Sequence, residues 1–158
     1  MKFSLKYCFV PIVLCLMVAC QKDPAANATA QLVFRAEVAA GTAGAVAGEN
    51  LEGSNSTVWF GEAHSFDVKY ADARLGGSGK PVVSFELKGE EKEAFGDFTE
   101  SLIGQRMAIE IDGKILSAPT ISGRLPVGGE ISGGGGGFTE QEVNDLVHFL
   151  RTGESGSG

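Results

Sequence analysis

Alternating apolar and polar side chains predict three stretches of extended structure in the N-terminal part of the chain. Every second residue from Val83 to Leu87 is apolar, which gives the segment 81–87 one apolar face when the chain is extended. Residues 31–38 are apolar and branched, and residues 57–75 alternate well enough for extended structure. We therefore expect a strand in each segment, with a glycine-rich turn between the last two.

The segment 104–123 predicts a hairpin of two strands. Its Asp112-Gly113 pair favours a type I′ turn, because both central residues of that turn need positive φ. Pro119 cannot donate a hydrogen bond to a neighbouring strand, so we expect the second strand to lie at a sheet edge or to end there. A two-residue turn would pair Ile111 with Lys114, Ile109 with Leu116 and Met107 with Ala118, and would bury Met107, Ile109, Leu116 and Ala118 on one face.

Residues 88–104 predict the first of two helices. Glutamates near its start suit the positive end of a helix dipole, and Gly104 is placed to end it in a left-handed conformation. Gly96 lowers the stability of this helix by about 1 kcal/mol relative to alanine. Its apolar stripe, at spacings of three and four, is formed by Phe95, Phe98 and Leu102.

Residues 138–153 predict the second helix. Thr139 is placed to cap its start, Glu142 completes a capping box, and Gly153 is placed to stop it. The residues expected to face the core are Val143, Leu146, Val147 and Leu150.

Glycine-rich segments separate these elements. We interpret residues 39–57 as a long loop, with a poor helix as the alternative for part of it. We interpret residues 123–137 as a mobile connection with a short apolar island. Apolar residues exposed on a mobile loop are candidates for contact with other proteins. The residues expected to contact polypeptide are Leu125, Pro126, Val127 and Ile131.

These elements predict one α+β domain over residues 31–153. We expect a mixed, mostly antiparallel sheet with two helices packed on one face. The apolar fraction of 43% is enough for a core of that size. Residues 154–158 are expected to form a disordered tail.

The N-terminus has the pattern of a bacterial lipoprotein signal. Lys2 and Lys6 precede an uncharged, mostly apolar run over residues 8–19, which is too short to span a bilayer. Residues 16–20, LMVAC, resemble a lipobox, in which the cysteine is acylated and becomes the first residue of the mature protein.

We therefore expect residues 1–19 to be a signal peptide, Cys20 to carry acyl chains such as palmitate, and residues 20–30 to be a flexible tether. The alternative is an ordinary secretory signal cleaved after Ala19. The expected location is the cell envelope, with the domain lipid-anchored and facing the periplasm. Gln21 gives no clear retention signal, which favours the outer membrane over the inner.

The charge and the cysteine content argue against two classes of function, nucleic-acid binding and thiolate metal binding. The chain has 13 Lys and Arg against 20 Asp and Glu, and removal of Lys2 and Lys6 leaves 11 − 20 = −9. An acidic body of this kind disfavours nucleic acid as a partner. Cys8 and Cys15 lie in the expected signal peptide, so the mature chain has no cysteine pair for a disulfide or a thiolate metal site.

The sequence does not predict a catalytic, metal or cofactor site. Glu62 and His64 would share one face of a strand, but no third metal ligand is evident. His148 lies next to the apolar stripe of its helix, where a solvent-facing histidine is the simpler interpretation. Asp112 is explained by the hairpin turn. We therefore expect a protein that is not an enzyme and needs no cofactor.

Several motifs occur in an order that resembles the periplasmic head domain of SecD, a subunit of the bacterial SecDF protein-export machinery. The resemblance covers about residues 70–153. The motifs are GKPVVSF at 79–85, AIEIDGKILSAP at 108–119, GEISG at 129–133 and FTEQEVNDLVHFLRTG at 138–153.

The resemblance implies a mixed sheet with two helices on one face, and transient contact with unfolded polypeptide outside the inner membrane. SecD carries this head between membrane helices that couple export to the proton gradient. Such helices are not evident in this chain, so we expect that it does not power transport by itself. The glycine run at 133–137 is also longer than the connection usual in the family.

Two hypotheses follow. In the first, the protein is a lipid-anchored, non-catalytic module that binds unfolded or extended polypeptides, in contact with the Sec translocon or another envelope protein, and assists export or envelope assembly. In the second, it is a repurposed adaptor that keeps the fold but binds one folded envelope protein and has no role in translocation.

Overall fold

The computed structural model describes residues 30–49, 51, 56–134 and 136–154. The expected signal peptide, the expected lipid site at Cys20, nearly all of the tether and residues 155–158 lie outside the described residues. Within the described ranges, no helix has the length and apolar character needed to cross a bilayer.

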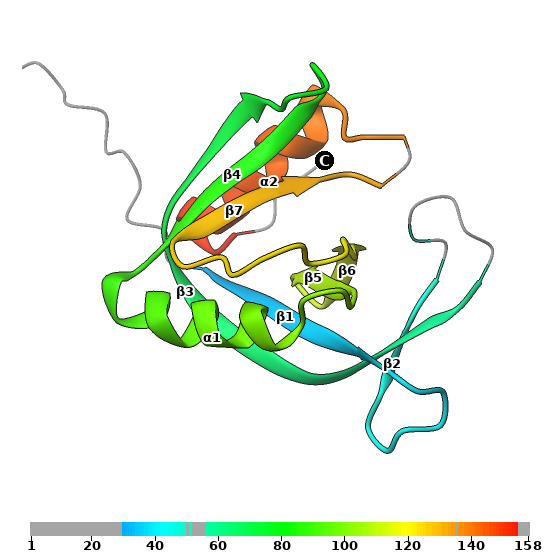
Figure 1. Cartoon of the computed structure of the whole chain (residues 1–158). Helices are drawn as coiled ribbons and strands as arrows, with labels where there is room; N and C mark the ends of the chain where they lie inside the picture. The colour runs from blue at the N-terminus through cyan, green and yellow to red at the C-terminus, as the bar shows by residue number, and fades with distance from the viewer. Residues whose placement is uncertain (1–29, 50, 52–55, 135, 155–158) are drawn as a thin grey trace, which may run out of the picture.

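One curled sheet organises the domain (Figure 1). The strand order is β6-β5-β1-β3-β4-β7, and β2 pairs with β3 beside this path. Every pairing among these strands is antiparallel, which confirms the α+β class and a mostly antiparallel sheet. The strands are β1 (Gln31–Val38), β2 (Val46–Gly48), β3 (Val58–Leu75), β4 (Pro81–Leu87), β5 (Met107–Ile111), β6 (Lys114–Ser117) and β7 (Gly128–Ser132).

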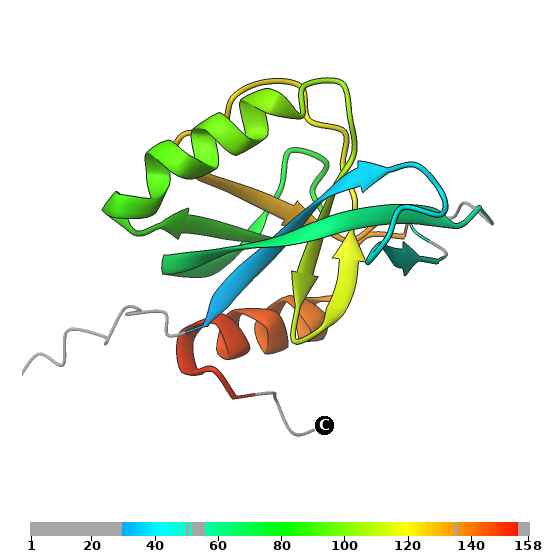
Figure 2. The same cartoon turned by 90° about the horizontal axis from the view of Figure 1, so that it is seen from below.

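Two helices lie near opposite ends of the strands (Figure 2). After β4 the chain passes through a 3₁₀ turn, η2 (Gly89–Glu91), and enters α1 (Lys92–Ser101). The second helix, α2 (Glu140–Thr152), lies near the other end of β4, where Val143 and Pro81 line the same small cavity. Both predicted helices are therefore present, and α1 is shorter than expected because its first turn is 3₁₀.

Both helices send apolar side chains into one core. Phe95 of α1 is fully buried, and its ring centroid lies 5.0 Å from that of Phe34 and 5.2 Å from that of Phe66. Burial of a side chain of this size contributes about 1.5–3 kcal/mol to the free energy of unfolding. The other fully buried residues of this main core are Leu32, Phe34, Val68, Ala71, Val83, Leu87, Ile131, Val143 and Leu150.

The expectation of an unbroken loop over residues 39–57 is wrong. The strand β2 forms within this segment and pairs with the start of β3, with Val46 opposite Phe60. Phe60 is fully buried and joins Leu51 and two alanines of the β5–β6 region in a second, smaller core. The strand was missed because its three residues, Val-Ala-Gly, carry too little alternation to predict one.

The Asp112-Gly113 turn forms as predicted. Asp112 has a φ of 52° and Gly113 a φ of 73°, and Ile111 pairs with Lys114. The strand β6 ends at Ser117, and β6 is the outermost strand on its side of the sheet. The prediction that the second strand is an edge strand ending near the proline is confirmed.

The expected register of the hairpin is wrong beyond this first pair. Ile109 lies opposite Ser117 rather than Leu116, because one extra residue on β6 makes a bulge. Met107 donates its backbone N–H to Pro119 (3.0 Å) and is not paired with Ala118. Ala118 consequently packs in the second core, while Leu116 packs against the main core.

The expectation of a mobile connection over residues 123–137 is also wrong. It contains β7, in which Ile131 pairs with Val83 and is fully buried. The preceding loop is fixed to α1, because the Leu125 backbone N–H donates to the buried Thr99 hydroxyl (2.9 Å). Arg124 also donates to Asp97 on the same helix (3.0 Å).

The ends of α2 follow the sequence signals. The Thr139 hydroxyl accepts from the Glu142 backbone N–H (3.2 Å), and the Glu142 carboxylate accepts from the Thr139 backbone N–H (2.8 Å). Gly153 ends the helix at a φ of 76°. The predicted capping box and stop are confirmed.

Candidate functional site

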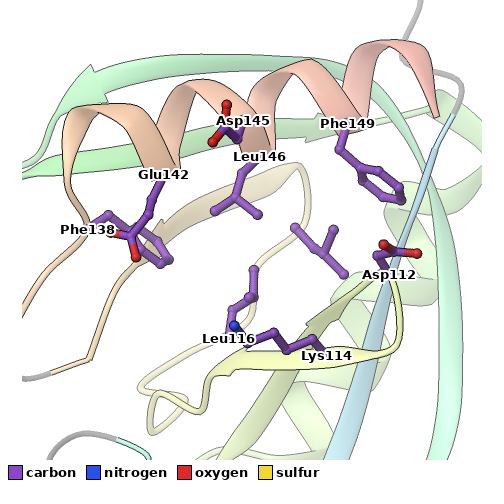
Figure 3. Close-up of a pocket in the computed structure, with 9 residues that line it drawn as sticks. Asp112, Lys114, Leu116, Phe138, Glu142, Asp145, Leu146 and Phe149 are labelled. Atoms are coloured by element: carbon purple, nitrogen blue, oxygen red, sulfur yellow. The ribbon is translucent and has the colours of Figure 1, made fainter. Parts of the chain in front are cut away.

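An apolar groove runs between α2 and the β5–β6 hairpin (Figure 3). Its volume is about 330 Å³, within the range typical of small ligand sites. The lining residues are Ile111, Asp112, Lys114 and Leu116 from the hairpin, Phe138 just before α2, and Glu142, Asp145, Leu146 and Phe149 from α2. Apolar side chains form most of its wall, which makes it a candidate site for apolar groups of a partner.

The helix supplies its half of the groove from one flank. Val143, Val147 and Leu150 occupy the stripe that is buried in the main core. Leu146 and Phe149 lie beside that stripe and are only half-buried, packed against the edge of the main core. Figure 3 shows both side chains pointing from α2 toward the hairpin.

The hairpin supplies the opposite wall. Ile111 is buried at the end of β5, and Leu116 is half-buried on β6. The tight turn between these strands brings Asp112 close to the C-terminal half of α2, where it lies across from Phe149 (Figure 3). The local turn signal thus positions part of the wall, and the packing of α2 completes it.

Charged groups line the rim of the groove. Glu142 and Asp145 lie on α2, and Asp112 and Lys114 lie on the hairpin. Hydrogen bonds from the Thr139 backbone N–H and hydroxyl lower the pKa of Glu142, and the positive charge of Lys114 lowers it further. Asp145 accepts a hydrogen bond from the Gln141 amide (2.8 Å). The groove therefore combines an apolar floor with an acidic rim.

The four residues expected to contact polypeptide do not form one exposed cluster. Val127 is 48% exposed and Pro126 is also exposed, while Leu125 is half-buried. Ile131 is fully buried in β7, so its expected exposure is wrong. The contact role of the other three stays a prediction. Leu125 lines a smaller cavity of about 200 Å³ over the phenylalanines of the main core.

The residues considered for chemistry lie on three different elements. His64 is exposed on β3 with its ring against Phe98 (centroids 4.4 Å apart), His148 is exposed on α2, and Asp112 is in the hairpin turn. Across the described ranges, no three His, Cys, Asp or Glu side chains are grouped so that they could hold a metal ion.

Sequence reasoning missed the groove itself. Leu146 was assigned to the core and Phe149 was given no role, although an apolar residue beside a complete buried stripe is a signal of a second contact surface. From the sequence, Asp112 is explained by the turn and Lys114 is used only for strand pairing. Their relation to α2 depends on contacts between segments about thirty residues apart, which periodicity does not report.

Comparisons with family models and with individual sequences identify the same family. The family described as "SecDF, P1 head subdomain" matches residues 61–154. A protein translocase subunit SecD of Aquifex aeolicus is 48% identical over 87 residues, which is 55% of this chain and 17% of that protein. A SecD of Rhodobacter capsulatus is 41% identical over 81 residues, which is 51% of this chain and 14% of that protein. The chain thus spans less than a fifth of either relative.

Comparison with solved structures gives the same fold. A crystal structure of SecDF in a super-membrane-facing form matches 80% of this chain and 19% of its own, with a TM-score of 0.58 and 23% identity. A structure of the membrane component SecDF "that enhances protein export" matches 80% of this chain and 63% of its own, with a TM-score of 0.56 and 22% identity. Likeness at this level of identity concerns the fold alone.

Proposed function

This chain belongs to the SecDF P1 head subdomain family, and from that premise we propose that it is a non-catalytic module that binds extended polypeptides and assists their export or assembly in the cell envelope. The proposal extends to this chain the role of its relatives, which are protein translocase subunits. We also propose that it acts at the Sec translocon or beside another envelope protein.

The groove between α2 and the hairpin is the observation that carries this proposal. It has an apolar floor formed by residues such as Leu116, Leu146 and Phe149, as expected of a site for apolar side chains of an unfolded chain. The hairpin strand beside it, β6, pairs only with β5 in the strand order of the sheet. An extended segment could therefore lie along β6 and place alternate side chains in the groove.

We propose that a lipid on Cys20 holds the domain at a membrane, facing the periplasm, with the outer membrane favoured. The chain enters the domain at the end of α2, because the Ala30 backbone N–H donates to the Leu150 carbonyl (3.4 Å). The ten residues from Gln21 to Ala30 reach at most about 35 Å from Cys20 when extended. A lipid at Cys20 would thus keep the groove close to the membrane surface.

The experiment that tests binding is site-specific photocrosslinking in the native envelope. A photoreactive phenylalanine analogue would replace Phe149 in the groove or, as the control, His148, which is exposed on the same helix and does not line the groove. We expect crosslinks to many different exported chains from residue 149 and few from residue 148.

Other outcomes separate the alternatives. One stoichiometric crosslinked protein would support the adaptor hypothesis instead. Equal labelling from both positions, or labelling from neither, would contradict polypeptide binding in the groove. Mass spectrometry of the purified protein tests the anchor separately, because an unmodified Cys20 in a membrane-free protein would exclude it.

A further inference from the structure

We infer that the groove between α2 and the hairpin selects apolar segments that carry lysine or arginine over equal segments that carry carboxylates. This inference rests on the proposed function, because it names the class of polypeptide that the same site takes. Charge complementarity between the rim and the bound segment carries the argument.

The rim is strongly asymmetric in charge. Its ionisable residues are three carboxylates and one ammonium group, so its net charge is 1 − 3 = −2. Figure 3 shows Glu142 beside Phe138 toward one end of the apolar floor and Asp112 opposite Phe149 toward the other. A segment lying along the floor would therefore pass the two carboxylates of α2, Glu142 and Asp145.

Among the described residues, the two rim carboxylates on α2 form no ion pair with a base, although the nearby charge of Lys114 acts on Glu142. Several other carboxylates of the domain do pair with bases, as in the Arg35–Glu110 pair (2.7 Å) and the Lys88–Asp67 pair (2.7 Å). The hydrogen bonds described for Glu142 and Asp145 come instead from uncharged groups, namely the Thr139 backbone and hydroxyl and the Gln141 amide. Neutral donors orient a carboxylate without cancelling its charge.

Screening by water and salt limits how strongly the groove can prefer cationic over anionic segments. These carboxylates lie at an open rim, where water and salt screen each interaction with a bound cation. We therefore expect cationic segments to bind about three- to tenfold more tightly at low ionic strength, and the preference to disappear as the Debye length shrinks below the distance between the charges.

The test compares matched peptides on the full protein purified from envelopes in detergent. The peptides are short, fluorescently labelled and built on one alternating Leu/Val sequence that carries two Lys, two Gln or two Glu. Fluorescence anisotropy at about 20 mM and about 300 mM salt gives the dissociation constants. We expect the order Lys, Gln, Glu from tight to weak at low salt, and near-equal affinities at high salt.

Two variants locate the effect. The double variant Glu142→Gln/Asp145→Asn removes two rim charges, and Gln at residue 142 can still complete the capping box. It should reduce the Lys-over-Glu ratio to about twofold or less. The control is Glu140→Gln, which makes the same change on the same helix at a residue that does not line the groove, and it should leave the ratio unchanged. Circular dichroism melting checks that each variant is folded.

The outcomes distinguish this inference from the function on which it rests. If all three peptides bind equally to the wild-type protein, and Leu146→Ser abolishes that binding, the charge preference is wrong and polypeptide binding in the groove stands. If the ratio survives in the double variant, the rim is not its source and the inference is also wrong. If no peptide binds, or Leu146→Ser has no effect, the proposed site fails and the inference fails with it.

Discussion

The guanidinium group of Arg124 lies against the backbone of Gly96 in α1. A Cβ at residue 96 would be 2.5 Å from the Arg124 Cζ, so a side chain there would displace the guanidinium group. From this position Arg124 reaches Asp97 (3.0 Å) and Glu100 (3.5 Å) on the same helix. The glycine that sequence reasoning treated only as a weak point of the helix is thus the residue that lets the loop before β7 dock.

This contact predicts coupling between Gly96 and Arg124. In an Arg124→Ala background, Gly96→Ala should stabilise the protein by about 1 kcal/mol, because alanine is the better helix former. With Arg124 present the gain should be smaller by at least about 0.5 kcal/mol, since the guanidinium group must move. Urea unfolding of the two single variants and the double variant measures the coupling. If the two substitutions change the free energy of unfolding additively, the contact contributes nothing to stability.

Thr99 gives a second prediction for the same loop. Its buried hydroxyl donates to the Gly96 carbonyl (3.0 Å) and accepts from the Leu125 backbone N–H (2.9 Å). Thr99→Val keeps the shape but leaves the Leu125 N–H unpaired, which should cost about 1–3 kcal/mol. The control is Ser101→Ala, whose exposed hydroxyl bonds only within the helix, and a change below about 0.5 kcal/mol is expected there.

Hydrogen exchange locates the effect of Thr99→Val. The Leu125 amide should exchange faster in the variant, while amides of α2 keep their wild-type rates. Unchanged protection at Leu125 would mean that the loop is held by Arg124 or by packing instead.

The capping box at the start of α2 gives a prediction that depends on pH. Thr139→Ala should destabilise the protein by about 1 kcal/mol near neutral pH, because the Glu142 backbone N–H loses its acceptor. The pKa of Glu142 lies below its ordinary value of 4.5, since the ionised carboxylate accepts from the Thr139 backbone N–H and hydroxyl. The stability that the ionised Glu142 carboxylate contributes is complete above the pKa that Glu142 has in the unfolded chain. It is lost as the pH falls through the lower pKa that Glu142 has in the folded protein.

Glu142→Gln isolates that titration. The wild-type protein should be the more stable of the two near neutral pH, and the two should converge as the pH falls below 4.5 and through the lowered pKa of Glu142. Urea midpoints measured over this range for both proteins test the convergence. The ion pairs of Asp67 and Glu86 titrate equally in both and cancel in the difference. A constant difference across the range would show that the Glu142 charge has no part in the cap.

The sequence predicted elements whose signals are local. The Asp112-Gly113 turn and the Thr139–Glu142 capping box are satisfied by their nearest neighbours in the chain, so the residues involved are sufficient to specify them. The long alternating segment that forms β3 was predicted for the same reason.

The features that the sequence did not predict depend on distant partners. The strand β7 contains two glycines and one large apolar residue, and it becomes a strand because Val83 and its neighbours in β4 pair with it. The bulge on β6 places Ala118 in the second core beside Ala108, and alternation alone cannot signal an extra residue. The groove likewise exists only because α2 docks next to the hairpin, so Leu146 and Phe149 could be placed on a helix but not beside Leu116.

Ile131 and Val127 provide the last prediction, because the sequence grouped them and the structure separates them. Ile131 is fully buried between β4 and the helices, so Ile131→Ala should leave a cavity and cost about 3 kcal/mol. Val127 is 48% exposed, and Val127→Ala should change the free energy of unfolding by less than about 0.5 kcal/mol. Urea unfolding of both variants tests the contrast. Equal losses would mean that the loop is as tightly packed as β7, and peptide binding that depends on Val127 but not on Phe149 would move the contact surface from the groove to this loop.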